Sequence, residues 1–593
     1  MKNFLKYTLA SVIGVFIAGF LIIGFFIASL STMSSVLENP TPSLKDKSIL
    51  VLKLDQSIVE RTTKDPFRIL RYMKFYSSEE IGLNDILDNI KKAEKDEKIK
   101  GIYLNPIDLN CGYASVEEIR NALIDFKKTG KFVYAYGETL SQKAYYLVSV
   151  ADKIIMNPQG LLEFRGLSAR MLFYKEAMNK LGVDMQVIRH GKFKAAMEPF
   201  MRSDMSAENK LQTATYMNSI WNQILKGISK SRNISIDKLK ELADGVTTFR
   251  KTDFLKKEGL IDTMMYKDQL IKELKEKTRI QKDKDLRTIS LTRYSDVPPT
   301  TDGLGLAKEK VAVVYASGEI GMKAGGTRGE NIDYEELSRT IREAREDTSI
   351  DAIVLRINSP GGSAYGSEVI WREVKLAAEE KPLIVSMGDY AASGGYYIAA
   401  AADTIMADYT TITGSIGIFG TLPNAQKLLR DKIGITEDYV NTNKNSNFLS
   451  VTRPMTQFEK DYFQRYIEVG YDTFISRVAE GRNMKKEQVD SIGQGRVWSS
   501  ENAIENGLID MYGGIGDAVK LAAKKAGLKR YRIVSLPKIK DPFDQILSEL
   551  YGNVSLKILK DKIGSQFKLY EEMNRISNMK GIYARMPFDL ELN

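Results

Sequence analysis

The sequence is poor in the two residues that most often carry metal and acid–base chemistry. Its 593 residues include one cysteine, Cys111, and one histidine, His190. A single cysteine excludes an intrachain disulfide, and the two counts together exclude a zinc site of the cysteine or multi-histidine type. One histidine would still suffice for a single catalytic triad. We therefore expect no metal and no cofactor, and a catalyst built from Ser, Lys, Asp, Glu or backbone amides.

Positively and negatively charged residues are also nearly balanced in number. The chain has 86 Lys and Arg against 76 Asp and Glu, a net charge of +10 that is thin for this length. We interpret these charges as part of a solvated surface, which at most lies near anionic lipid. We expect no nucleic-acid partner. With 43% hydrophobic and 27% charged residues, the composition is that of a folded protein, and the length implies several domains.

One long uncharged segment lies at the N-terminus. Residues 7–37 carry no charge, and residues 9–30 are almost wholly apolar, enough for a helix to cross the roughly 30 Å hydrocarbon layer. A cleaved signal peptide usually has a shorter apolar core of about 7–15 residues, so we favour a retained anchor. Lys2 and Lys6 precede the run, which predicts a cytoplasmic N-terminus and an extracytoplasmic remainder.

The rest of the chain contains an internal duplication. A shift of 251 positions aligns residues 101–167 with 352–418 without a gap, and pairs Tyr145-Tyr146 with Tyr396-Tyr397. Such a long repeat indicates one domain used twice. A polar, proline-rich stretch separates the copies. We thus predict an N-terminus and anchor at 1–32, a first copy at 33–294, a linker at 295–305, a second copy at 306–537 and a tail without clear role at 538–593.

Strand and helix patterns alternate within each copy. In the second copy short apolar runs predict strands at 310–320, 351–359, 382–388 and 404–409, and amphipathic runs predict helices at 332–347, 366–380 and 393–403. This order predicts an α/β fold with a mainly parallel sheet covered by helices. Ligands of such folds gather at the carboxyl ends of the strands.

Two glycine-rich loops fall at strand ends in the second copy, at 359–363 and 389–395. The latter places Ser393 at the start of a helix, where free N–H groups can stabilise an oxyanion. A glycine pair alone can also simply make a turn. However, the first copy has Gln142 in place of Ser393 and Leu109-Asn110-Cys111 in place of the glycine loop. We therefore interpret Cys111 as a buried or incidental thiol.

A serine nucleophile needs a base, and a lysine with a lowered pKa can serve. The segment 189–200 clusters cations among apolar residues, although an ordinary basic turn would look the same. Lys192 in it aligns with Lys444, whereas Lys194 aligns with Ser446. Lys194 is thus particular to the first copy, as Ser393 is to the second.

At these residues the chain resembles the signal peptide peptidase A (protease IV) family in its long, duplicated bacterial form. The likeness covers nearly the whole chain, including Phe193-Lys194-Ala195-Ala196-Met197-Glu198-Pro199-Phe200, Asn358-Ser359-Pro360-Gly361-Gly362, Ala392-Ser393-Gly394-Gly395-Tyr396 and Thr413-Gly414-Ser415-Ile416-Gly417. The resemblance implies two tandem Clp/crotonase-like domains and a Ser/Lys dyad. Ser393 would be the nucleophile and Lys194 the general base, with Ser415 positioning the lysine and Gly361 and Gly394 forming the oxyanion hole.

The resemblance further implies a homotetramer in the bacterial inner membrane, with the ectodomain on the periplasmic side, that degrades signal peptides after their cleavage from secreted proteins. His190, beside the lysine, would tune Lys194 or lie on the surface, and we favour the surface. Two other functions stay open. A crotonase-like acyl-CoA enzyme could use the same fold and oxyanion loops, although an extracytoplasmic domain would lack coenzyme A. A non-catalytic membrane scaffold could have kept only a peptide groove.

Overall fold

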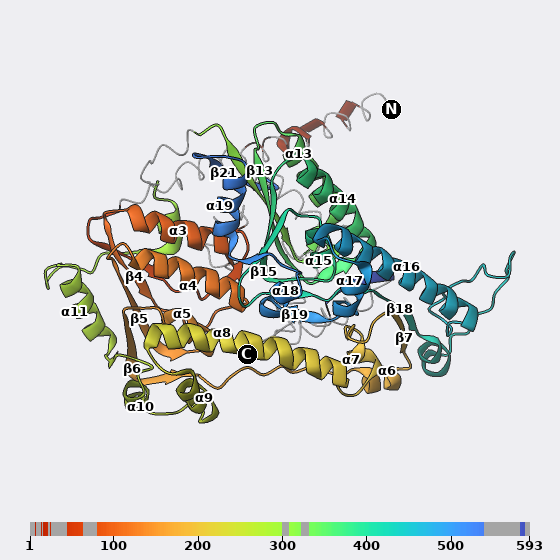
Figure 1. Ribbon diagram of the computed structural model, residues 1–593, viewed down its shortest axis with the longest axis horizontal. Coiled ribbons are helices and arrows are strands. Elements are labelled where there is room, and N and C mark those ends of the chain that lie inside the picture. The colour runs from red at the N-terminus through yellow and green to blue at the C-terminus, as the bar shows by residue number, and fades with distance from the viewer. Residues whose placement is uncertain are drawn as a thin grey trace.

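The computed structural model (Figure 1) describes most of the region predicted to hold the two copies. Besides a few separate positions between 6 and 24, it describes residues 44–62, 80–298, 307–321, 331–538 and 581–586. Among these residues, no helix is both long and apolar enough to cross a bilayer. Most of the predicted anchor at 9–30, most of the linker and most of the tail lie outside the described residues.

The first copy forms a parallel sheet in the order β8-β6-β5-β4-β1-β9. Its strands are apolar and mostly buried, as expected where helices cover a parallel sheet. They are β1 (Ser48–Leu52), β4 (Ile99–Leu104), β5 (Phe132–Leu140), β6 (Lys153–Leu162), β8 (Thr263–Met264) and β9 (Thr288–Ser290). The helices packed near them include α3 (Leu83–Lys95), α4 (Tyr113–Lys127) and α5 (Gln142–Val148).

The second copy repeats this arrangement in the order β19-β17-β15-β13-β10-β21, with β16 beside β15 and β20 beside β16. The strands are β10 (Lys310–Ser317), β13 (Ala352–Ser359), β15 (Leu383–Ala392), β16 (Thr404–Ala407), β17 (Ile412–Gly414), β19 (Val497–Ser499), β20 (Met511–Tyr512) and β21 (Arg532–Leu536). All but β19 pair in parallel. The prediction of an α/β fold built on mainly parallel sheets is confirmed in both copies.

The elements predicted for the second copy appear close to their expected bounds. The three helices are α13 (Tyr334–Glu346), α14 (Ala364–Glu380) and α15 (Gly394–Ala399). One difference concerns β15, which continues through the predicted loop up to Ala392. This extension pairs with β17 after a register shift in its pairing with β13, so the residue before Ser393 is held by the sheet rather than by a free loop.

A long helix of the first copy reaches across to the second. Helix α8 (Ala207–Arg232) begins at Ser206, whose side chain accepts a hydrogen bond from the Asn209 N–H. Figure 1 shows α8 running beneath both halves of the molecule, alongside β19. Ser219 Oγ on this helix donates to Glu501 of the second copy at 2.8 Å. The equivalent helix of the second copy, α16 (Gln457–Arg482), extends outward instead (Figure 1).

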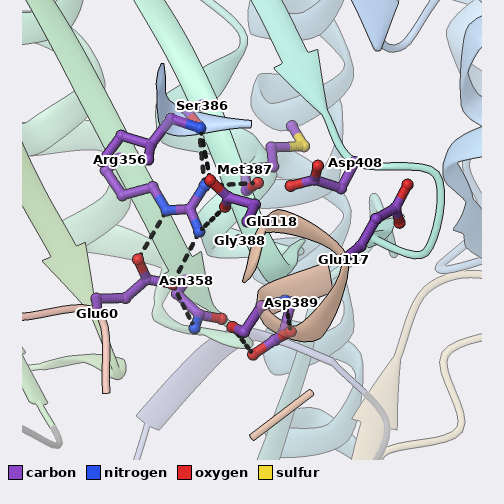
Figure 2. Close-up of polar contacts among 12 residues, drawn as sticks. Glu60, Glu117, Glu118, Arg356, Asn358, Ser386, Met387, Gly388, Asp389 and Asp408 are labelled. Carbon is purple, nitrogen blue, oxygen red and sulfur yellow. Dashed lines mark hydrogen bonds and ion pairs between the residues drawn. The ribbon is translucent and has the colours of Figure 1, made fainter. Parts of the chain in front are cut away.

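A buried arginine joins the two copies (Figure 2). Arg356 on β13 has no exposed side-chain surface and forms ion pairs with Glu60 at 2.7 Å and Glu118 at 2.6 Å, both from the first copy. Its Nη1 also donates to Ser386 Oγ at 2.9 Å. Because the guanidinium has lost its water, it depends on these carboxylates for stabilisation. The ion pairs therefore couple the β13 strand to the first copy.

A second contact uses the end of β15. Asp389 accepts hydrogen bonds from the N–H groups of Gly112 and Ser115, at 3.1 and 2.9 Å, and from Ser115 Oγ. These donors lie at the start of α4, whose N-cap residue, Gly112, has no side chain to cap it. A carboxylate satisfies such free N–H groups well. Asp389 of the second copy thus caps helix α4 of the first copy. In the sequence, Asp389 lies only four residues before Ser393.

We predict that Arg356→Leu lowers the free energy of unfolding by about 3–5 kcal/mol, because Glu60 and Glu118 would stay buried without their cation. The midpoint of chemical denaturation measures this. The matched control is Arg430→Leu, which breaks an ion pair with Asp431 between side chains that are 62% and 47% exposed. Exposed pairs contribute little, so the control should denature close to the wild type. An Arg356→Leu protein as stable as the wild type would contradict this account.

Candidate active site

A third sheet combines strands from both copies and brings the site together. Its order is β12-β11-β14-β22-β18-β7. The strands are β7 (Asp184–Arg189), β11 (Glu319–Gly321), β12 (Asn331–Asp333), β14 (Gly361–Ser363), β18 (Phe419–Asn424) and β22 (Gly581–Arg585). Strand β7 of the first copy pairs antiparallel with β18 of the second along its whole length. The segment after β7, which carries Lys194, therefore enters the second copy.

Ser393 sits at a tight turn between β15 and α15. Its backbone has φ +55° and ψ −114°, a conformation that an L-residue adopts only under constraint. The constraint comes from both sides, since the Ser393 N–H donates to the Gly414 carbonyl at 2.7 Å and the Ser393 carbonyl accepts from the Tyr397 N–H at 2.8 Å. Such strain at a strand-to-helix turn is typical of a nucleophile.

Lys194 reaches this serine from the other copy. Its Nζ lies 2.7 Å from Ser393 Oγ, at hydrogen-bond distance. The side chains of both residues are buried, and burial holds the pKa of the Lys194 amine well below its ordinary value of 10.5. Desolvation penalises the charged form and favours the neutral amine, whose lone pair can accept the serine proton.

Ser415 fixes the other side of the lysine amine. Its carbonyl oxygen lies 3.0 Å and its Oγ 3.1 Å from Lys194 Nζ. The residue adopts φ +51°, and its own N–H donates to the Arg496 carbonyl at 2.7 Å. With Ser393 Oγ, these two oxygens surround the amine with three hydrogen-bond partners. The expectation that Ser415 orients Lys194 agrees with this geometry.

The two glycines predicted for the oxyanion hole lie next to each other. A Cβ atom on Gly361, whose φ is +99°, would be 2.6 Å from the Gly394 nitrogen, so no side chain fits there. The Gly361 N–H donates to Ser359 Oγ at 3.2 Å, and an oxyanion would have to share or replace this long hydrogen bond. Ser359 Oγ itself donates to the Gly318 carbonyl at 2.6 Å, which fixes its orientation.

The corresponding place in the first copy is closed by a side chain. Gln142, which aligns with Ser393, begins α5 and is buried. Its Oε1 accepts hydrogen bonds from the N–H groups of Arg165 and Gly166, at 3.0 and 2.9 Å. The Gln142 side-chain amide thus binds backbone N–H groups of its own copy. Within the described part of the chain the dyad is assembled once, with Lys194 from the first copy and Ser393 from the second.

Sequence reasoning missed a glutamine that positions the lysine segment. Gln212, buried on α8, donates to the Phe193 carbonyl at 3.1 Å and accepts from the Val497 N–H of the second copy at 3.1 Å. Arg189, expected only as one of the cations of the 189–200 segment, donates from Nη1 to the Lys194 carbonyl at 2.9 Å. In the sequence, Gln212 could be noticed only as a polar residue on the inward face of an amphipathic helix. Many helices carry such a residue, so this feature does not single it out.

The two scarce residues lie outside the dyad. The His190 ring stacks on Tyr471, with 4.0 Å between ring centroids, and the residue is half-buried. Cys111 is also half-buried, and desolvation raises the pKa of its thiol, with Asp389 adding to the shift. A raised pKa disfavours the thiolate, which is the reactive form. The interpretation of Cys111 as an incidental thiol agrees with this environment.

A strained serine, a desolvated lysine and adjacent glycine amides at strand ends of an α/β domain are typical of a serine hydrolase. Comparison with models of protein families shows which family within this class the chain matches. The model of peptidase family S49 matches residues 125–281 and 375–529, one match in each copy. The chain belongs to peptidase family S49, and it is a serine peptidase with a duplicated family domain.

Named relatives agree with this membership. Protease 4 of Haemophilus influenzae is 38% identical over 450 residues, 74% of this chain and 72% of the relative. The chloroplastic serine protease SPPA of Arabidopsis thaliana is 34% identical over 513 residues, 85% of this chain and 74% of the relative. A putative signal peptide peptidase SppA of Enterococcus faecium is 32% identical over 34% of this chain and 58% of its own. Among solved structures, ClpP1 of Listeria monocytogenes matches with 16% identity and a TM-score of 0.23, over 35% of this chain and 94% of that chain.

The burial of Lys194 predicts a particular pH dependence. Only the neutral amine accepts the Ser393 proton, so acylation of Ser393 should slow as the pH falls through the pKa of Lys194 and level off above it. Because that pKa is lowered by desolvation, the midpoint should lie well below 10.5. The measurement is the rate of labelling by a serine-directed phosphonate across pH. A labelling rate that still rises between pH 9 and 11 would show a lysine with its ordinary pKa of about 10.4.

Proposed function

We propose that the protein is a membrane-anchored endopeptidase that degrades hydrophobic signal peptides with a Ser393/Lys194 dyad. The observation that carries the proposal is the buried 2.7 Å contact between Lys194 Nζ and Ser393 Oγ. The relative from Enterococcus faecium named as a putative signal peptide peptidase supports this class of substrate. Membership of a peptidase family argues against the acyl-CoA enzyme and the scaffold.

The dyad works as an acyl-transfer catalyst. Neutral Lys194 takes the Ser393 proton while Oγ attacks a peptide carbonyl, and N–H groups at Gly361 and Gly394 stabilise the oxyanion. The protonated amine then passes its proton to the leaving amine of the substrate. An acyl-enzyme remains, and water hydrolyses it with Lys194 again as base. Ser415 holds the amine in line with Oγ during both steps.

We propose a domain architecture for the chain as well. Each copy is a Clp/crotonase-like domain, at 33–294 and 306–537, which the repeated strand order supports. We also propose a homotetramer. Its support is an aromatic row on α16 at Phe458, Tyr462 and Tyr466, which are 50%, 53% and 60% exposed and would be covered by another copy of the chain.

Substitution of the dyad tests the catalytic roles. Ser393→Ala removes the nucleophile and should abolish hydrolysis of a hydrophobic peptide ester. Lys194→Ala removes the base and should lower kcat/KM by about 10²–10⁴-fold. Lys192→Ala is the matched control, because Lys192 is an exposed lysine two positions away. Steady-state kinetics on the purified chain measure all four proteins. Rates equal to the wild type in either dyad variant would contradict the proposal.

The anchor proposal rests on the apolar run at 9–30 behind Lys2 and Lys6. It places the protein in the bacterial inner membrane, with both copies on the periplasmic side. Deletion of residues 1–32 should move the protein from the membrane fraction to the soluble fraction, with ester hydrolysis retained. Fractionation with immunodetection measures the distribution. A full-length chain recovered in the soluble fraction would contradict the anchor.

A further inference from the structure

One buried side-chain amide links the main chains that carry the two dyad residues. Gln212 on α8 has no exposed surface. Its Nε2 donates to the carbonyl of Phe193, the residue bonded to Lys194, and its Oε1 accepts from the Val497 N–H in β19, each at 3.1 Å. Figure 1 shows α8 running alongside β19, where these contacts form. A single side chain thus joins the lysine segment to a strand of the second copy.

Strand β19 and the residue before it also hold both serines of the site through the backbone. Val497 lies opposite Gly414 in the sheet, and the Gly414 carbonyl accepts from the Ser393 N–H at 2.7 Å. The carbonyl of the residue before Val497 accepts from the Ser415 N–H, also at 2.7 Å. The Gln212 amide therefore connects to both serines through one strand and its backbone hydrogen bonds. A displacement of this amide would move the lysine relative to both.

Two further buried side chains fix which end of the amide faces which partner. Glu198, the first residue of α7 (Glu198–Met201), accepts at Oε2 from Asn209 Nδ2 at 2.9 Å. With its nitrogen bound to this carboxylate, the Asn209 amide presents its oxygen to Gln212, whose Nε2 donates to it at 3.1 Å. An amide has one donor end and one acceptor end, so the Gln212 oxygen is left for the Val497 N–H.

The second copy lacks this arrangement on the equivalent helix. Helices α8 and α16 each have 26 residues and a C-cap asparagine in the left-handed conformation, so they align residue for residue. Tyr462 takes the place of Gln212 and is 53% exposed. Glu459 takes the place of Asn209 and forms an ion pair with Arg453 of its own copy. The bridging amide is thus particular to the copy that carries the lysine.

We propose that Gln212 is a positioning residue that sets the separation between Lys194 Nζ and Ser393 Oγ. Asn209 and Glu198 act through Gln212 by fixing its orientation. The inference rests on the proposed Ser393/Lys194 mechanism. Both hydrogen-bond partners of the Gln212 amide outside α8 are main-chain groups, so the residue acts on the reaction through those groups. A misplacement of about 1 Å in a catalytic group can cost about 10²-fold in rate.

Gln212→Met tests the inference, because methionine has a similar length but cannot bridge a carbonyl and an N–H group. The variant should lower kcat for a hydrophobic peptide ester by about 10–100-fold and keep KM within about twofold of the wild type. KM should hold because Gln212 is fully buried and lies out of reach of the substrate. Labelling of Ser393 by a serine-directed phosphonate should slow by a similar factor. Both rates are measured on the purified full-length chain.

Ser219→Ala is the matched control. It removes another hydrogen bond from α8 to the second copy, the 2.8 Å contact of Ser219 Oγ with Glu501, and leaves both main-chain contacts of Gln212 in place. Its kcat should stay within about twofold of the wild type, because the bond it removes is to a side chain and not to the main chain that holds the dyad. Equal losses of kcat in Ser219→Ala and Gln212→Met would show that α8 only holds the copies together, and would overturn the inference.

A second variant leaves Gln212 itself intact. Asn209→Asp sets two carboxylates against each other and removes the donor to Glu198, so the orientation of the Gln212 amide is lost. We expect kcat to fall by about tenfold with KM unchanged. Addition of Glu198→Gln returns a donor to this contact and should recover most of the lost kcat. A double variant as slow as Asn209→Asp alone would contradict the orienting role.

Lys194→Ala in the same assays separates this inference from the proposed function. If Lys194→Ala is inactive and Gln212→Met keeps the wild-type kcat, the dyad stands and the positioning role is overturned. If Lys194→Ala is as active as the wild type, the proposed function fails and the positioning role fails with it. The midpoint of chemical denaturation shows that each variant is folded. If Gln212→Met does not fold, Asn209→Asp and its double variant with Glu198→Gln decide the outcome.

Discussion

The hydrogen bond between Lys194 and Ser393 is the contact on which the rest of the structure depends. It joins two copies of one domain, and it requires that an amine be buried at the expense of its hydration. Desolvation of this kind lowers the pKa of a lysine and lets its amine act as a base. The mixed sheet supplies the geometry, because the pairing of β7 with β18 delivers the lysine segment to the serine.

The interface between the copies is therefore part of the catalytic apparatus. Arg356 lies two residues before Asn358 and three before Ser359, at the base of the glycine loop, and Asp389 lies four before Ser393. Both side chains bind groups of the first copy. Burial raises the pKa of Glu117 to about 7 in the same region, although hydrogen bonds from Thr410 oppose the shift. The loops that carry the serine and the glycines are thus fixed by the copy that carries the lysine.

The duplication made much of this site predictable from the sequence. Comparison of the copies singled out Ser393 and Lys194, because neither residue has an identical counterpart in the other copy. The strand pattern put Ser393 at the start of a helix, but it ended the preceding strand too early, since β15 continues to Ala392. Contacts between copies were not predictable, since Glu60 and Arg356 are 296 residues apart and no local pattern relates them. A charged residue within the apolar strand at 352–357 was the one hint of a buried ion pair. The sequence did not predict strand β22 for a similar reason. Its partner strands are far away in the sequence, and five residues are too few to show a reliable hydrophobic period.

The most direct test of the central claim is the ionisation state of the Lys194 amine. Carbon-13 NMR of the lysine Cε atoms in full-length protein, with the Lys194 signal assigned by its loss in Lys194→Arg, reports the charge as the pH is varied. The account predicts that the Lys194 amine loses its proton with a midpoint well below that of the exposed lysines. A Lys194 signal that titrates with the exposed lysines would contradict it.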